Sequence, residues 1–490
     1  MINILTYDDT NPLSIKGYGE TLIGKIFLDV LNAANIDEHL KQEILIKINN
    51  PNYKGGMGHL IEKYHFKYKI NNNQEPDFPK AGVELKVTPY EIGKKGGYSA
   101  GERLVITMIS YKTAVEEDFY ASHAFKKLHL TLLVHYLRNR LILRVEYPIN
   151  FVTLFSPPEE DMKIIQQDYE KIITKVKEGK AHELSEGDTM YLGASTKGSN
   201  SVKSNVPQEF YAPNQKARKR AFCYKQSYMT YILNKYVRNK VDTYESILSS
   251  VHDIEDKTLE ELIVDKINTY HGKSDVQLSS EFDVKPGAKS FWSSLAYRML
   301  GIKSNRAEEF EKANIEVKTI RLEENGKMKQ SISFPNIILK ELAKEEWEES
   351  NFRNDLSSKR YLFVVFKKKG VNYVLKGCQL WNMSNEDLDE ACIGWETIQQ
   401  VVQQGVKLWK KYDNNGIDFK VKNDFPEKTA NRIIHIRPHT SKRYYVLEDG
   451  EVIGTNPVYG DELPDGRVMT KQCFWLNNSY ILSQLSNELK

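Results

Sequence analysis

The sequence predicts an α/β protein made of two tandem copies of one domain, the second copy degenerate. At 490 residues the chain is too long for one ordinary core. Short segments with strand periodicity alternate with segments of helical periodicity, which is typical of an α/β fold. The succession of segments in the first half also appears again in the second. We therefore expect domains at 1–238 and 257–490, with a linker region at 239–256.

The composition bounds the class of protein. With 40% hydrophobic and 28% charged residues it is that of a soluble globular chain, and a formal net charge of +3 neither requires nor excludes nucleic acid. No stretch approaches about 18 consecutive apolar residues, and the N-terminus lacks the blocks of a signal peptide. We expect a cytoplasmic protein with no membrane partner. The four cysteines have no paired metal-ligand spacing and are interpreted as reduced thiols.

The first elements are predicted to be helices. Apolar residues recur at helical spacing over 17–34, and a second helix is expected at 38–48. A third, amphipathic helix at 58–66 carries Glu62.

The segment 75–87, EPDFPKAGVELKV, contains the residues most suited to chemistry. Its second half alternates apolar and charged residues, which predicts a strand with one buried face and places Glu84 and Lys86 on the other. Asp77 lies seven residues before Glu84, and the proline and glycine between them supply turn chemistry. Two carboxylates suit Mg²⁺, and an ammonium can orient the attacking water or offset phosphate charge. A solvated strand face is the alternative.

Three segments carry a resemblance to a known family. KGGMGHLIEKY, DFPKAGVELKVTP and SHAFKKLHLTLLV are similar, in order and spacing, to the catalytic core of the MutH family. That family includes the mismatch-repair nicking enzyme and larger GATC-cutting type II restriction endonucleases. The resemblance implies a restriction-endonuclease-like (PD-D/ExK) fold, with a mixed central sheet flanked by helices.

The resemblance also implies roles for individual residues. Asp77 and Glu84 would bind Mg²⁺, and Glu62 would join the metal shell directly or through water. Lys86 would orient water or stabilise charge, and Lys127 matches a further family lysine, with Lys126 as its rival. No histidine is expected to act as a general base.

The rest of the first half continues the alternation. Strands are expected at 130–136 and near 141–155, followed by a polar amphipathic helix whose start carries two prolines and three acids. A short strand then enters a Gly/Ser/Lys-rich loop within 189–205, and a helix is expected at 227–234.

A basic run at 216–225, KARKRAFCYK, has five cations in ten residues around two aromatic residues. Such a cluster suits phosphates, although a solvated face is the alternative. Its position matches the DNA-contacting end of the family's second subdomain. The DNA-binding residues expected in the first domain are Lys197, Arg218, Lys219, Arg220, Tyr224 and Lys225.

The second half repeats the segments without the full set of active-site residues. EEFEKANIEVKTI aligns with PDFPKAGVELKVT and places Glu316 on Glu84 and Lys318 on Lys86. The remaining positions change: Asp77 becomes Glu309, Glu62 becomes Tyr297 and Lys127 becomes Ser357. A tyrosine cannot replace the helical carboxylate, and a glutamate is one methylene longer at a metal that demands near-ideal geometry. We expect no cleavage from this copy.

The end of the second copy keeps binding features. IHIRPHTSKR at 434–443 and QCFWLNNSY at 472–480 resemble the family elements that reach DNA, which indicates Arg437, Trp475 and Asn477 as contacts. The second half is thus interpreted as a DNA-binding regulator of the first. The alternative is a buttress for the catalytic domain.

Together these observations predict a Mg²⁺-dependent type II restriction endonuclease. Its N-terminal domain would make double-strand cuts, at the target GATC that the resemblance implies, and its C-terminal domain would bind a second DNA site and act as an allosteric effector. We also expect a dimer on DNA. The alternatives are a methylation-directed nicking enzyme of repair type and a catalytically inactive sequence-specific DNA-binding protein.

Overall fold

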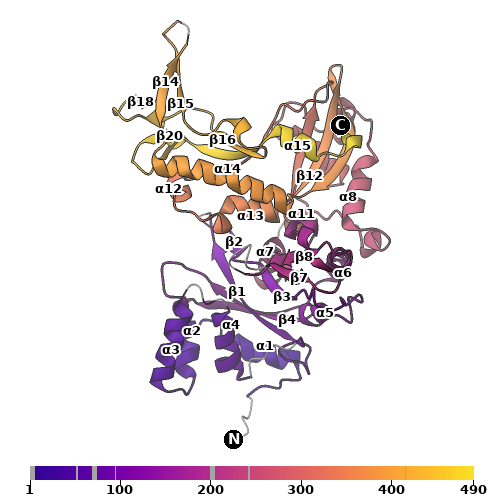
Figure 1. Ribbon diagram of the computed structural model, residues 1–490. Helices are drawn as coiled ribbons and strands as arrows, with labels where there is room; N and C mark the ends of the chain where they lie inside the picture. Colours follow the sequence, from indigo (N-terminus) through magenta and orange to yellow (C-terminus); the bar gives the residue numbers. More distant parts are fainter. Residues whose placement is uncertain are drawn as a thin grey trace. The chain divides into compact units, whose positions relative to one another are not determined.

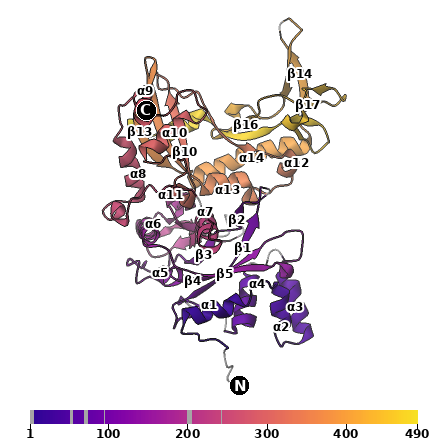
Figure 2. The same ribbon diagram turned by 180° about the vertical axis from the view of Figure 1, so that it is seen from behind.

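The structure is a computed structural model that describes residues 6–50, 53, 55–68, 74–93, 95–198, 205–240, 243–413 and 415–490. The chain divides into two compact units (Figures 1 and 2). Unit 1 comprises Met1–Leu262 and Ile302–Ile315, and unit 2 comprises Ile263–Gly301 and Glu316–Lys490. A segment from the second half of the sequence thus folds with unit 1, whereas the sequence suggested one continuous second domain after a single linker.

Unit 1 contains nine α-helices or parts of helices among the described residues. They are α1 (Pro12–Glu20), α2 (Phe27–Ala33), α3 (Glu38–Asn49), α4 (Gly56–Leu60), α5 (His123–Leu128), α6 (Glu159–Lys177), α7 (Gln226–Ile232), the start of α8 (Leu259–Asn268) and α11 (Glu308–Ala313). Its strands are β1 (Glu84–Ile92), β2 (Tyr98–Ala100), β3 (Leu104–Met108), β4 (Thr131–Leu137), β5 (Ile149–Phe155), β6 (Leu192–Thr196), β7 (Asn205–Gln208), β8 (Ala212–Arg218) and β9 (Arg220–Tyr224).

The main sheet of unit 1 is mixed, as predicted. Its order is β2-β1-β4-β5, with β1 parallel to β4 and the two outer pairs antiparallel. Glu84 pairs in register with Thr131 at the start of the β1–β4 ladder. Helices α1, α2 and α4 pack one face of the sheet in a core that includes Phe27, Leu60 and Leu132 (Figure 1).

The helix predicted at 17–34 is two helices, α1 and α2. Gly24 has a φ of +84°, a left-handed conformation that favours glycine and interrupts a right-handed helix. The Gly24 N–H donates to the carbonyl of Ile149 at 2.9 Å, and the Ile149 N–H donates to Lys25 at 2.8 Å. The helical periodicity was correct for each helix, but between them the backbone of Gly24 and Lys25 forms hydrogen bonds with the start of strand β5.

A second sheet of unit 1, β3-β9-β6, is antiparallel and contains the second half of the basic run, residues 220–224. It is fixed to the predicted amphipathic helix, α6, by one buried carboxylate. Asp168 accepts hydrogen bonds from the backbone N–H groups of Met190, Tyr191 and Leu192 at 2.6 to 2.9 Å. The strand expected near 141–155 is shorter, because 144–146 form a 3₁₀ turn before β5.

Unit 2 repeats much of this order. Its helices are the remainder of α8, α9 (Asp275–Phe282), α10 (Phe291–Met299), α12 (Leu339–Leu342), α13 (Asn351–Ser358), α14 (Asn385–Gln404) and α15 (Asn478–Gln484). Its strands are β10 (Ile315–Leu322), β11 (Ile332–Asn336), β12 (Arg360–Lys369), β13 (Asn372–Trp381), β14 (Leu408–Tyr412), β15 (Phe419–Asn423), β16 (Ile434–Pro438), β17 (Tyr445–Val446), β18 (Val452–Ile453), β19 (Gly460–Glu462), β20 (Val468–Thr470) and β21 (Gln472–Leu476).

Two sheets of unit 2 correspond to the two sheets of unit 1. The order β10-β12-β13 parallels β1-β4-β5, and β11-β21-β16 parallels β3-β9-β6. Helix α14 follows β13 as α6 follows β5, and α15 follows β21 as α7 follows β9. The β14–β15 hairpin is an addition between α14 and β16. This correspondence supports tandem copies of one architecture.

Within the described ranges, no helix is long and apolar enough to cross a membrane.

Candidate active site

A tight turn brings Asp77 beside Glu84. The N–H of Phe78 donates to the Val83 carbonyl at 2.9 Å, the reverse bond is 3.2 Å, and Gly82 closes the turn with a φ of +67°. The Asp77 N–H then donates to Glu84 Oε2 at 3.2 Å, and the Leu85 N–H donates to Asp77 Oδ2 at 2.9 Å. The Glu84 carboxylate is therefore held by the backbone of Asp77, and the Asp77 carboxylate by the backbone of the residue after Glu84.

Two lysines converge on Glu84. Lys86 Nζ lies 2.8 Å from Glu84 Oε1, and Lys127 Nζ lies 3.3 Å from the same oxygen. Lys126 instead pairs with the exposed Glu75 at 2.9 Å, which separates it from its rival Lys127. Of the two neighbouring lysines in α5, only Lys127 reaches the cluster.

The expectation of a strand with one buried face was wrong at this point. The Glu84 residue is only 3% exposed, as deeply covered as the apolar residues beside it. A carboxylate can be buried in this way because two ammonium groups compensate its charge. The alternation in the sequence marked the strand, but the charged face is an interior site rather than a solvated surface.

Glu62 belongs to the same electrostatic cluster. Helix α4 continues as a π-helix at Ile61–Phe66, a form often found at functional sites, and Glu62 lies in its first turn. Burial raises the pKa of Glu62, and the charges that act on it are those of Lys86, Glu84 and Lys127. The helical carboxylate is thus positioned towards the two others.

The protonation of Asp77 is perturbed in a way that suits cation binding. Burial and the negative charge of Glu84 raise the pKa of Asp77 to about 6, against the opposing effect of Lys86. A cation between the two carboxylates would relieve this repulsion and favour the ionised form.

Tyr68 is a member of this site that sequence reasoning missed. Its hydroxyl is buried without a hydrogen-bond partner among the described residues. Burial and the charges of Asp77, Glu62 and Glu84 all raise its pKa. A single tyrosine between two motifs has no sequence signal of its own, so only the folded site indicates it.

The residues present fit a divalent cation that is completed by substrate. Within the described ranges, no three His, Cys, Asp or Glu side chains enclose a metal position by themselves. Mg²⁺ is usually held by one or two carboxylates together with waters and phosphate oxygens. Two mutually repelling carboxylates and an orphaned buried hydroxyl match such a partly protein-made site.

The basic run divides into surface and interior residues. Lys219 is exposed and Arg218 is half-buried, and the Lys197 N–H donates to the Lys219 carbonyl at 2.8 Å. These three residues lie together at the ends of β6, β8 and β9. They remain the candidates for phosphate contacts in unit 1.

Arg220, Tyr224 and Lys225 do not belong with them, because the structure buries all three. Arg220 donates to the Ala194 carbonyl at 2.6 Å, and Lys225 donates to the Thr189 carbonyl. The Tyr224 hydroxyl donates to the carbonyl of Leu128 at 2.8 Å, directly after Lys127. The basic run is thus partly internal, because β9 is the central strand of its sheet and is buried over its whole length, and Tyr224 positions helix α5.

Unit 2 keeps part of the cluster around Glu316. Lys318 lies 2.5 Å from Glu316 Oε1, and Lys359 lies 3.1 Å from Glu316 Oε2 and 3.5 Å from Asp355. The assignment of Ser357 to the Lys127 position was wrong, because Lys359, the residue between α13 and β12, supplies the second cation. The predicted position is two residues too early, in the sequence Ser-Ser-Lys at 357–359.

Glu309, which the sequence placed at the first metal position of the second copy, is used otherwise. Its carboxylate accepts from Ser246 Oγ at 2.6 Å and from the N–H groups of Ile247 and Leu248 at 2.9 and 3.2 Å. It fastens the segment around 247 within unit 1.

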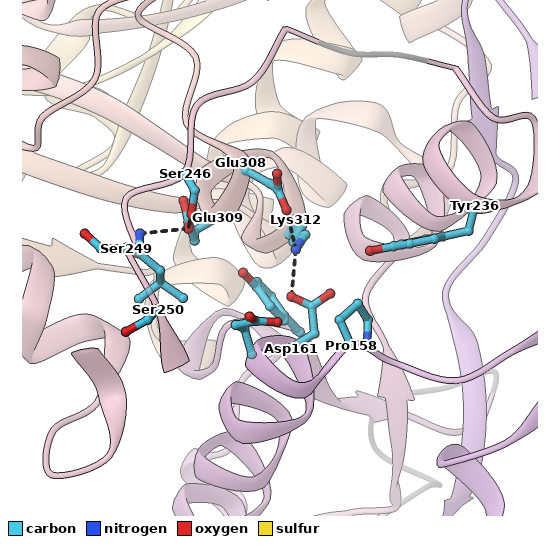
Figure 3. A pocket seen from close by; sticks show the side chains of 12 residues that line it. Pro158, Asp161, Tyr236, Ser246, Ser249, Ser250, Glu308, Glu309 and Lys312 are labelled. Atoms are coloured by element: carbon cyan, nitrogen blue, oxygen red, sulfur yellow. Dashed lines mark hydrogen bonds and ion pairs between the residues drawn. The ribbon is translucent and has the colours of Figure 1, made fainter. Parts of the chain in front are cut away.

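The neighbouring residue Lys312 is also buried in unit 1. It lies 2.6 Å from Asp161 and 2.7 Å from Glu308 (Figure 3). These residues line a cavity of about 250 Å³ that contains no member of the Asp77 and Glu84 cluster. The charged residues there pair with one another, so we interpret this cluster as a structural one that anchors helix α11.

The predicted contacts of unit 2 also separate. Arg437 is exposed, its guanidinium stacks 3.7 Å from the Trp475 ring, and both line an open concavity of about 410 Å³ together with His439. Asn477 does not belong with them because it is 2% exposed. Its amide nitrogen donates to the carbonyls of Asn431 and Arg432 at 2.8 and 3.0 Å, so it holds the β16–β21 junction.

Comparisons with known proteins agree with this arrangement. A family model described as MutH, DNA mismatch repair enzyme MutH, matches residues 66–168 and 300–391. The chain is 34% identical over 462 residues to the type II restriction enzyme Sau3AI of Staphylococcus aureus, covering 89% of this chain and 93% of that enzyme. It is 28% identical over 194 residues to the DNA mismatch repair protein MutH of Vibrio campbellii, covering 38% of this chain and 80% of that protein. The corresponding protein of Vibrio parahaemolyticus is 27% identical over 194 residues.

Proposed function

Because the chain belongs to the MutH family and is a site-specific endonuclease of the restriction type, we propose that it makes double-strand cuts at GATC by Mg²⁺-dependent phosphodiester hydrolysis. Unit 1 is the catalytic part in this proposal, and unit 2 binds a second duplex segment and regulates the first.

The observation that carries the proposal is the cluster of Asp77, Glu84, Lys86 and Lys127. Two carboxylates held by a tight turn and two ammonium groups within 3.3 Å of Glu84 meet at the parallel β1–β4 pair. A merely structural ion pair would need one cation for one buried carboxylate. The second carboxylate, that of Asp77, lies where burial and the charge of Glu84 raise its pKa, and perturbed pKa values of this kind are typical of functional sites.

In this proposal Asp77 and Glu84 hold the cation, with Glu62 contributing directly or through water. A bound Mg²⁺ supplies Lewis-acid polarisation of the scissile phosphate and a nucleophilic water at neutral pH. Lys86 and Lys127 fix the orientation of Glu84 and place positive charge where negative charge develops on the phosphate. The Tyr68 hydroxyl is available to donate to a water or a phosphate oxygen in the same site.

Restriction, rather than repair nicking, is favoured by the extent of the similarity. The match to the restriction enzyme covers 89% of this chain, whereas the match to the repair protein covers 38% of it. The family model also matches twice, once around Asp77 and Glu84 and once around Glu316 and Lys318. A second copy that binds DNA gives a two-site enzyme, which works on two duplex segments or as a dimer on DNA.

The test is cleavage of a supercoiled circle that contains a single GATC, with a matched circle in which that site is changed. Linear product from the first circle alone supports a double-strand restriction enzyme. Nicked circle as the end product would support the repair-type activity, and no change in any divalent cation would support a binding protein. Circles with and without methylation at the site then show whether methylation governs cleavage.

The role of unit 2 is tested on circles with one and two sites. If unit 2 is an allosteric effector, the two-site circle is cut faster, and an added uncleavable GATC duplex accelerates the one-site circle. Equal rates in all three cases would leave unit 2 as a buttress.

A further inference from the structure

The β14–β15 hairpin of unit 2 has one strongly basic face. The two strands form an antiparallel ribbon that extends away from the rest of unit 2 in both views (Figures 1 and 2). Trp409 pairs with Lys422 and Lys411 pairs with Lys420 in the register. Because side chains alternate along a strand, these four residues share one face, and all four are exposed, Trp409 by 46%.

The opposite face of the ribbon packs against unit 2 and fixes its orientation. Leu408, Phe419 and Val421 contact the hydrophobic core of the unit. Lys410, which lies on this inner face, pairs with Glu451 and places its ammonium 4.8 Å from the Phe419 ring. The inner lysine is therefore compensated, and the outer face is the one left to solvent.

The outer face carries positive charge without compensation. The paired segments contain no Asp or Glu, and no side-chain bond or ion pair joins the ammonium groups of Lys411, Lys420 and Lys422 to a residue that the structure describes. Asp413 and Asp418 lie in the turn, where the Asp413 carboxylate accepts backbone N–H groups. Like charges directly opposite each other destabilise a strand pair, and Lys411 and Lys420 are directly opposite. An anionic partner would remove this repulsion.

The basic face is also connected to the concavity at Arg437 and Trp475. The chain continues from Arg437, in strand β16, to Arg443, which donates to the Phe419 carbonyl at 3.1 Å and lies 5.4 Å from its ring. Six residues of extended chain span at most about 20 Å. One turn of duplex DNA is longer, about 34 Å, so a duplex that lies along the line from the concavity to Phe419 reaches the turn end of the paired segments of the ribbon.

We propose that the outer face of the ribbon binds the sugar-phosphate backbone of the duplex held by unit 2. Lys411, Lys420 and Lys422 contact phosphates, and Trp409 packs against the adjacent sugars. Lysines on phosphates position a protein on the duplex without reading sequence. The ribbon therefore adds affinity that is independent of GATC. This inference rests on the proposal that unit 2 binds duplex DNA.

The experiment uses the full chain and a labelled 30-base-pair duplex in EDTA, so that binding is measured without cleavage. The triple variant Lys411→Gln, Lys420→Gln, Lys422→Gln is compared with the wild type over a series of salt concentrations. Each lost phosphate contact lowers the slope of log K against log salt by about 0.9, so a decrease of about 2 to 3 is expected. Affinity at about 0.1 M salt should fall at least tenfold, equally for duplexes with and without GATC.

Two further variants serve as controls. Lys410→Gln removes a lysine of the same ribbon that faces inward, so it should leave the salt slope unchanged. Arginine at all three outer positions keeps the charge and should retain the salt slope of the wild type.

The ribbon proposal would be overturned by a triple glutamine variant that melts at the wild-type temperature and also has the wild-type salt slope. The outer face of the ribbon would then face solvent or contact protein. Loss of preference for GATC in that variant would also overturn it, because it would make the ribbon a sequence reader. If the wild type cleaves DNA and the ribbon variants bind it like the wild type, the ribbon proposal fails and the proposed function stands. If the wild type neither binds nor cleaves DNA, the ribbon proposal and the proposed function both fail.

Discussion

Replacing Asp77 by asparagine should stabilise the metal-free protein while abolishing cleavage. Burial and the charge of Glu84 raise the pKa of Asp77 to about 6 from its usual 3.8. Folding therefore favours the protonated carboxyl, and holding the ionised form at pH 8 costs stability. The side chain of asparagine keeps an oxygen for the Leu85 N–H and can donate to Glu84, so it removes the charge without removing the bonds.

The magnitude follows from the pKa. A rise of about two pH units at about 1.4 kcal/mol each gives about 3 kcal/mol at pH 8. The penalty is absent below about pH 3.8, grows between there and about pH 6, and is complete above. For a unit of this size the gain corresponds to a melting temperature about 5 °C higher.

The assay is calorimetric melting of the full chain in EDTA at pH 8 and at pH 4.5. The difference between Asp77→Asn and the wild type should be less than half as large at pH 4.5, because both proteins are then nearly neutral at this position. Glu75→Gln is the matched control, since Glu75 lies two residues away, is exposed, and has its pKa lowered by a hydrogen bond from Lys126. Neutralising it should not raise the melting temperature.

Two results would refute the reasoning. An Asp77→Asn protein that melts at or below the wild-type temperature at pH 8 would mean that the two carboxylates do not repel each other in the folded state. A gain that is equal at both pH values would assign it to packing rather than to charge.

Three further outcomes are expected. Replacing Lys312 by methionine should lower the free energy of unfolding by about 3 kcal/mol or more, measured in urea, because it leaves Asp161 buried without its cation, and a change under 1 kcal/mol would contradict this. Lys127→Ala should slow single-turnover cleavage about a hundredfold while Lys126→Ala stays within threefold, and equal effects would remove the distinction between the two lysines. Mg²⁺ at ten times its Kd should raise the free energy of unfolding of the wild type by about 1.4 kcal/mol, and the same shift in Glu84→Gln would exclude Glu84 as a ligand.

Local sequence patterns were enough to predict the α/β class, the strand that carries Glu84 and Lys86, and the turn that returns Asp77 to it. These features are local: a period of two, a proline and a glycine at a fixed offset, and helical spacing before and after. The resemblance to the family rested on the same short segments, which is why it survived comparison with known proteins.

Tertiary structure alone decided which residues of a motif face inward. Arg220 and Lys225 stand in a run of cations that indicates a surface, yet β9 lies within unit 1 and both donate to backbone carbonyls there. Charge density in sequence cannot distinguish the two faces of a strand whose neighbours are unknown. Trp475 and Asn477 show the same limit. They are two residues apart but differ in exposure, because Trp475 lies near the end of strand β21 and Asn477 is the residue that begins helix α15.

The fate of the second copy likewise depended on packing. The sequence aligned Glu309 with Asp77, but α11 folds with unit 1, where Glu309 binds three groups of the 246–248 segment and Lys312 pairs with Asp161. Lys359 reaches Glu316 from a position that alignment assigned to no cation. Alignment compares order along the chain, whereas an ion pair depends on where long side chains end in space. Local sequence pattern therefore predicted the helices and strands. Which charged residues form the candidate active site and which form structural ion pairs depended on the free energy of burying them in the folded protein.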